Sequence, residues 1–227
     1  MHGFGPVSGA VLAIMGKGPR EGCLEDDFGL GYPIAVEADG FLRSFEDALD
    51  ARGVPYAFVG GELKAAAFDG ARWVVCATSG CLAGELVSEL TAARARGAEI
   101  TVGPRAPRYD AAWKPANWAG LLDGANVLEL HDPATVDSLV ASMVHALQLP
   151  TFASDPDVIH VTAHEDAGGT LRVLFVINAS DEDQFARLTT GVDAEWQDAM
   201  TEARHVSAAG VLEVRVKRHS VRMLLRR

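Results

Sequence analysis

Residues 171–180 read LRVLFVINAS, and residues 210–225 read GVLEVRVKRHSVRMLL. In these stretches the apolar side chains run together or alternate with charged ones, a spacing of two that is typical of β-strands. The alternation starts near residue 158, after the linker at residues 150–156, and only strands and turns are expected beyond it. Upstream of residue 150, strand-like runs alternate with helical spacing. The sequence therefore predicts an α/β domain at residues 1–150 and an all-β domain at residues 151–227.

Short apolar runs mark the strands expected in the first domain. They lie at residues 11–15, 54–59, 73–77, 100–102 and 127–130. Helical spacing separates them: one helix follows Pro33, a second starts at Leu82 directly after a turn at residues 78–80, and a third starts at the Asp132–Pro133 cap. This alternation, with glycine-ended turns, predicts a doubly wound parallel sheet of flavodoxin-like type.

The second domain is expected to be a small antiparallel sandwich. Leu212, Val214 and Val216 alternate with charged residues, and glycines at positions 168 and 169 mark a hairpin turn. Such a pattern predicts an apolar inner face and a solvated outer face.

Composition narrows the possible partners. The 227 residues carry a formal net charge of −11, which disfavours nonspecific binding to nucleic acid or to an anionic membrane. No apolar run approaches the roughly 20 residues that a membrane span needs. The three cysteines are odd in number and lack a disulfide spacing, so reduced thiols and a cytoplasmic location are expected.

One cysteine has a suggestive context. Cys81 lies within Ser-Gly-Cys-Leu-Ala, where a strand is expected to turn into a helix. This context resembles the nucleophile turn of class I glutamine amidotransferases, in which a helix N-terminus lowers the pKa of the thiol. His131, after a later strand, is the candidate base. The alternative is a cysteine packed at the start of a helix.

Aromatic and basic residues gather at residues 103–120, which are expected to form a long loop. Trp113, Trp118 and Arg105 are the candidate substrate-binding residues, because exposed tryptophans stack on sugar rings or anchor interfaces. The alternative is a loop folded over the sheet edge with its aromatic side chains packed.

Neither a metal nor a cofactor is predicted. His160 and His164 share a strand face, but their α-carbons lie roughly 13 Å apart, too far for one ion. Gly16 and Gly18 lack the third glycine of the dinucleotide fingerprint, since Glu21 stands in its place.

Several stretches together carry a family resemblance. They are residues 41–59, 71–107 and 158–226, with Phe-Val-Ile-Asn at 175–178, Trp-x-Asp at 196–198 and a Ser-Val run within 219–224. They are similar to the accessory region that follows the catalytic barrel in family 42-type glycoside hydrolases, the β-galactosidases.

The resemblance implies a flavodoxin-like trimerisation domain followed by a β-sandwich. No catalytic acid is transferred, because in that family these residues lie on the barrel. The implied function is a non-catalytic accessory module that shapes or completes a carbohydrate-binding cleft. Its partners would be other copies of the chain, in a homo-oligomer, or a catalytic barrel subunit.

Overall fold

The computed structural model describes residues 5–6, 10–13, 33–59, 68–129, 132–166 and 168–227. The chain forms two compact units. One comprises Gly9–Ala48 and Ala57–Gln148, and the other comprises Leu149–Arg227 together with Leu49–Tyr56 and the N-terminal Met1–Ser8. His131 and the glycines at 16 and 18 lie outside the described residues.

The first unit is built on a parallel sheet. Its strands are β2 (Ala10–Ala13), β3 (Tyr56–Val59), β4 (Trp73–Leu82), β5 (Glu99–Asp110) and β6 (Asn126–Val127), in the order β3-β2-β4-β5-β6. β4 pairs in parallel with β2 on one side and with β5 on the other, and β5 pairs in parallel with β6. Each of the five expected strand regions contains a strand, so the predicted parallel α/β sheet is confirmed.

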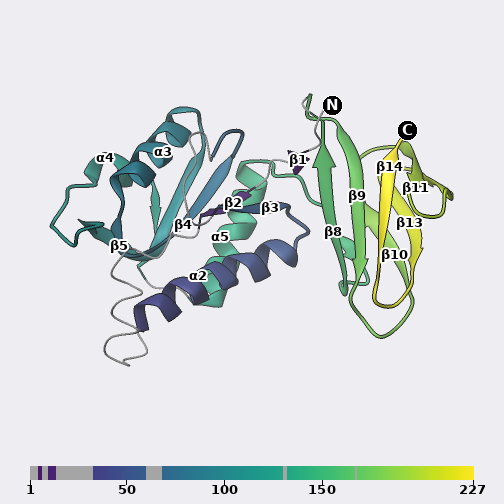
Figure 1. Cartoon of the computed structure of the whole chain (residues 1–227), viewed down its shortest axis with the longest axis horizontal. Helices are drawn as coiled ribbons and strands as arrows, with labels where there is room; N and C mark the ends of the chain where they lie inside the picture. The colour runs from purple at the N-terminus through teal and green to yellow at the C-terminus, as the bar shows by residue number, and fades with distance from the viewer. Residues whose placement is uncertain (1–4, 7–9, 14–32, 60–67, 130–131, 167) are drawn as a thin grey trace. The chain divides into compact units, whose positions relative to one another are not determined.

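Helices cover both faces of this sheet (Figure 1). The helices are α2 (Pro33–Asp50), α3 (Gly84–Ala95), the short α4 (Ala119–Leu122) and α5 (Pro133–Ala146). Leu86 and Leu90 of α3 share a core cluster with Val74 of β4. Trp73, the neighbouring residue, points to the other face, where its ring lies 5.6 Å from that of Phe45 on α2. The alternation of side chains along β4 thus gives each helix layer its own core.

The ends of β4 and β5 correct two expectations. The turn predicted at residues 78–80 is a bulge inside β4, with Gly80 at a φ of 98°. Thr78 Oγ1 accepts from Gly80 N at 3.0 Å and donates to the carbonyl of Cys81 at 3.2 Å. The strand therefore continues to Leu82, and α3 begins at Gly84 rather than at Leu82.

Likewise, residues 103–110 are not a loop, because they extend β5. The ladder between β4 and β5 continues to the pair formed by Leu82 and Asp110. Strand pairing gives the backbone N–H and C=O groups of residues 103–110 partners within the sheet, whereas a loop would leave these groups to solvent. These hydrogen bonds therefore favour a strand over a loop.

The second unit consists of two antiparallel sheets (Figure 1). The six-stranded sheet has the order β1 (Gly5–Pro6), β8 (Ile159–Glu165), β9 (Leu171–Asn178), β14 (Ser220–Arg226), β11 (Ala194–Asp198) and β12 (Arg204–Ser207). The three-stranded sheet has the order β13 (Val211–Val216), β10 (Gln184–Thr189) and β7 (Ser154–Asp155). Side chains of both sheets form one core cluster around the fully buried Trp196.

The outer face of this unit differs between its two sheets. On β13, Glu213 and Arg215 are exposed, as predicted. On the central strands β9 and β14, apolar side chains also occupy the outer positions: Phe175 faces Met223, and Ile177 faces Val221, which is 51% exposed. The outer face at the centre of the larger sheet is therefore partly exposed but carries apolar side chains.

Candidate functional site

The end of β5 continues into a short hairpin. Ala116 N donates to the carbonyl of Arg108 at 3.0 Å, Tyr109 bridges Pro115, and Asp110 N donates to the carbonyl of Lys114 at 2.9 Å. We call residues 108–116 the arm. In Figure 1 the arm belongs to the teal segment between the labels β5 and α4.

The turn of the arm is held by its own aspartate. Asp110 Oδ1 accepts from the backbone N–H of Ala112 at 2.8 Å and from that of Lys114 at 2.9 Å. Trp113 N donates to the carbonyl of Asp110 at 2.9 Å, and Trp113 itself has a φ of 58°. The carboxylate therefore has a structural role in closing the turn.

Two aromatic rings meet at the tip of the arm. The ring centroids of Tyr109 and Trp113 are 5.8 Å apart, with 38° between the planes. Tyr109 is 38% exposed, and Trp113 is half-buried. Tyr109 was not among the candidate residues predicted from the sequence, although its position four residues before Trp113 could have indicated the pairing.

The other two candidate substrate-binding residues have different surroundings. Trp118 packs against the core cluster under α3, and its indole N–H donates to the carbonyl of Tyr109 at 3.2 Å. Trp118 therefore connects the arm to the core of the first unit. Arg105 is exposed on β5, in register with Ser79 of β4. The structure thus brings Trp113 and Trp118 together around Tyr109, while Arg105 precedes the arm.

The arm also carries positive charge. The Arg108 side chain is 75% exposed, with its guanidinium 4.0 Å from a Glu129 carboxylate oxygen, and Lys114 is exposed. The arm thus has an aromatic pair that can stack on a ring, and it has exposed guanidinium and ammonium groups that can donate hydrogen bonds to hydroxyl or acidic groups.

Cys81 occupies the end of β4, two residues before the N-cap Ala83 of α3, and is 4% exposed. The strand-turn-helix elbow expected around it is therefore not formed as predicted, because the strand runs through the turn. The proposed pairing with His131 stays a prediction. Earlier on β4, burial raises the pKa of the Cys76 thiol to about 12, as expected for a thiol of the core.

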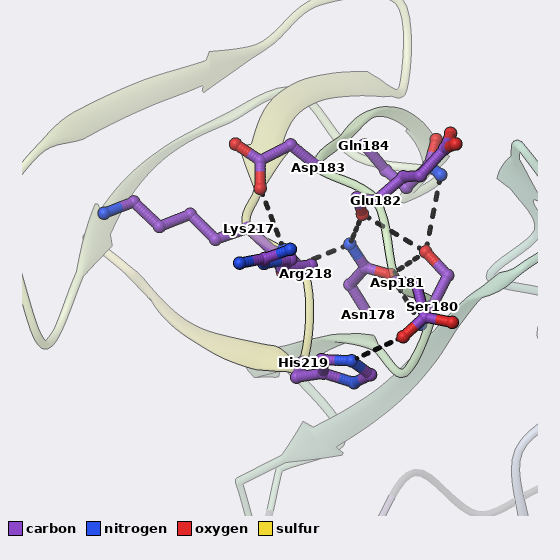
Figure 2. A network of polar contacts seen from close by, with 9 residues as sticks. All are labelled: Asn178, Ser180, Asp181, Glu182, Asp183, Gln184, Lys217, Arg218 and His219. Carbon is purple, nitrogen blue, oxygen red and sulfur yellow. Dashed lines mark hydrogen bonds and ion pairs between the residues drawn. The ribbon is translucent and has the colours of Figure 1, made fainter.

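A polar network closes one end of the sandwich (Figure 2). Asn178, 1% exposed, directs its Nδ2 group at the carbonyls of Glu182, Val216 and Lys217, at 2.8, 3.2 and 3.1 Å. Its Oδ1 accepts from Ser180 N at 3.0 Å. This residue ends the Phe-Val-Ile-Asn phrase, so the phrase ties the β9–β10 loop to the β13–β14 turn.

The exposed rim of this network pairs an acidic loop with a basic turn (Figure 2). Asp181 Oδ1 lies 2.9 Å from His219 Nε2, and both side chains are largely exposed. Asp183 accepts from Arg218 N and from Arg215 Nη2, each at 3.1 Å. The Arg218 N–H lowers the pKa of Asp183, against the raising effect of desolvation and with further help from Arg215. These contacts connect the β9–β10 loop to the β13–β14 turn.

A buried ion pair lies inside the sandwich. Asp198 is fully buried, and its Oδ2 is 2.7 Å from Arg222 Nη1, whose side chain is 22% exposed. Asp198 Oδ1 also accepts from Met200 N at 2.8 Å and Thr201 N at 3.0 Å. Burial alone would raise the pKa of Asp198, but these backbone donors and Arg222 hold it below its ordinary value. The pair joins the Trp-x-Asp phrase to the Ser-Val run.

Within the described part of the chain, no group of three His, Cys, Asp or Glu side chains is arranged to hold a metal ion. His164 instead packs edge-on against Phe175, with ring centroids 5.3 Å apart. None of the described helices is long and apolar enough to cross a membrane.

Comparisons with known proteins add a likeness of fold. No protein-family model matches the chain, and no curated protein matches it. Among solved structures, the β-galactosidase from Bacillus circulans sp. alkalophilus matches with a TM-score of 0.70 and 11% identity, over 98% of this chain and 42% of that one. The E323A catalytic mutant of Gan42B, a GH42 β-galactosidase from G. stearothermophilus, matches with a TM-score of 0.65 and 12% identity, over 95% of this chain and 40% of that one. The β-galactosidase from Halorubrum lacusprofundi matches with a TM-score of 0.60 and 13% identity, over 99% of this chain and 41% of that one. The chain thus spans about two fifths of the length of these structures.

Proposed function

We propose that this chain is a non-catalytic accessory and oligomerisation module of a GH42-type, β-galactosidase-like glycoside hydrolase. The observation that carries the proposal is the coverage of the structural match. The likeness to the Bacillus circulans β-galactosidase extends over 98% of this chain but only 42% of that protein. A likeness of this kind fits one part of a larger enzyme.

We assign the first unit to the flavodoxin-like class. Numbered along the chain within this sheet, the order β3-β2-β4-β5-β6 becomes 2-1-3-4-5, the strand order typical of flavodoxin-like sheets. This unit would serve as the trimerisation domain, and the antiparallel unit as the accessory sandwich. We also propose a cytoplasmic location, since Cys76 and Cys81 are free thiols, which are usual in a reducing compartment.

In this function the α/β unit associates with further copies of the chain or with a catalytic barrel subunit. Trp113, Trp118 and Arg105 are the residues we propose for contact with carbohydrate in the resulting cleft. The polar clusters of the sandwich support the proposal differently. Asn178 and Asp198 belong to the sequence motifs that carry the family resemblance. Both residues make structural contacts, Asn178 in the loop network and Asp198 in the ion pair with Arg222, so these motifs require no catalytic role here.

The proposal is tested with the purified chain, alone and mixed with a GH42 barrel protein whose own accessory region is deleted. Size-exclusion chromatography with light scattering measures assembly, and a chromogenic galactoside measures hydrolysis. We expect an oligomer, no hydrolysis by the chain alone, and raised activity in the mixture. Hydrolysis by the chain alone, or a monomer at tens of micromolar that does not bind the barrel, would contradict the proposal.

A further inference from the structure

A hollow of about 190 Å³ opens on the second unit. Its lining residues fall within two segments that are far apart in the sequence, residues 50–54 after α2 and residues 152–161 around β7 and the start of β8. Both segments belong to this unit. The volume exceeds the space that one water needs and lies below the roughly 300–1,000 Å³ of pockets for drug-sized ligands. The hollow therefore suits one small molecule.

Backbone contacts fix the two segments that line the hollow. Phe152 N donates to the carbonyl of Gly53 at 2.6 Å. Gly53 has a φ of 61°, and a Cβ at this position would lie 2.5 Å from the carbonyl carbon of Phe152, so glycine allows this close approach. On the other segment, Ser154 Oγ donates to the carbonyl of Pro156 at 3.3 Å and also to that of Ile159. These contacts belong to the fold, so the hollow is preformed.

Apolar side chains form part of the lining. Val54, Phe152 and Ile159 line the hollow and are buried. Phe152 and Ile159 also belong to the core cluster of the sandwich, so packing holds their positions. A ligand in the hollow would cover the apolar surface that these side chains present to it.

Polar side chains form another part of the lining. Asp50, Asp157 and His160 line the hollow and are exposed. Each carboxylate offers two acceptor oxygens, and an imidazole donates or accepts according to its tautomer. Solvent screens exposed charges, so these groups would hold a cation only weakly by charge. No metal-binding group of three side chains occurs in the described residues. The lining therefore favours a ligand with several hydrogen-bonding groups.

We propose that this hollow binds one monosaccharide. A pyranose ring has an apolar C–H surface, which matches Val54 and Phe152, and hydroxyl groups that donate and accept, which match Asp50, Asp157 and His160. Ligand sites commonly combine apolar walls with a few polar groups in this way. The hollow is distinct from the carbohydrate-contacting residues proposed for the first unit, and a sugar could enter it without assembly or a barrel subunit.

Saturation-transfer NMR on the purified chain tests the site, with D-galactose and D-glucose as probes and agmatine as a cationic comparison. We expect at least one hexose to bind with a Kd on the order of 1–10 mM, as is usual for a small, polar ligand. Agmatine should bind more weakly than that hexose. No binding of either hexose at tens of millimolar would overturn the proposal, and tighter binding of agmatine would overturn the ligand class.

Variants locate the bound sugar. Asp157→Ala removes a lining carboxylate, and Asp155→Ala is its matched control, because Asp155 is exposed two residues away on β7 and is not part of the lining. Hexose binding should weaken about 10-fold in Asp157→Ala and stay unchanged in Asp155→Ala. Ala51→Phe should also weaken binding, because it narrows the hollow without removing a polar group.

Thermal melting checks that the variants are folded. Asp157 and Ala51 are both exposed, so we expect melting temperatures close to that of the wild type. Hexose binding that both Asp157→Ala and Ala51→Phe retain would place the sugar elsewhere on the chain. That result would overturn this site and leave the proposed accessory function standing.

Discussion

Replacing Asp198 by asparagine should strongly destabilise the sandwich. The asparagine would keep the shape of the side chain, and its carbonyl could still accept from Met200 N and Thr201 N. It would lose the charge that balances Arg222, whose guanidinium is 2.7 Å away and only 22% exposed. The mutation would therefore leave a mostly buried cation without a counterion.

Removing one partner of a buried pair costs about 3–5 kcal/mol, and we expect the lower end, about 3 kcal/mol, because Arg222 can partly reach solvent. With a urea dependence of roughly 2–3 kcal/mol/M, the unfolding midpoint should fall by about 1–1.5 M. Tryptophan fluorescence follows the transition, and Trp196 contributes to the change because its side chain is fully buried in the same core.

The double variant Asp198→Asn/Arg222→Met tests the reasoning. The methionine would keep the packing of the arginine stem without the charge, so the double variant should be more stable than Asp198→Asn alone. A cost below about 1 kcal/mol for Asp198→Asn, or strictly additive effects of the two mutations, would show that the pair is not coupled as the structure indicates.

The same pair gives stability a pH dependence. The folded-state pKa of Asp198 is lowered, so its contribution is complete above the ordinary carboxyl pKa of about 4 and is lost as the pH falls through the folded value. Stability measured from neutral pH into acid should decline less steeply in Asp198→Asn than in the wild type. Equal slopes would contradict this assignment.

Three further outcomes follow from single positions. Asn178→Ala should cost about 2–3 kcal/mol in urea unfolding, because it leaves buried carbonyls at both loops without their donor. Gly53→Ala should cost more than about 2 kcal/mol, since its φ is 61° and an added Cβ would lie 2.5 Å from the backbone of Phe152; wild-type stability would refute this. Mass spectrometry after alkylation should find Cys76 unmodified until the protein unfolds, and rapid labelling of Cys81 in the folded protein would favour the thiol-enzyme alternative.

Apolar spacing in the sequence determined the elements and their broad class. A run such as residues 73–77 fits a strand buried on both faces, and the Asp132–Pro133 pair satisfies the start of a helix, where the Asp132 side chain accepts from Thr135 N. These features are local, since each depends on the next few residues. They were sufficient to predict a parallel sheet with helices followed by antiparallel strands.

The tertiary structure decided the features that depend on partners distant in sequence. A Thr-Ser-Gly turn became a bulge, and an expected loop became the end of β5, because pairing of the two strands satisfies both backbones at once. Tyr109 joined Trp113 only through the hairpin, and Asp198 found Arg222 only across the sheet. The local sequence indicates whether a residue favours a helix, a strand or a turn. It does not indicate these pairings, because they form only when the fold brings two distant segments together.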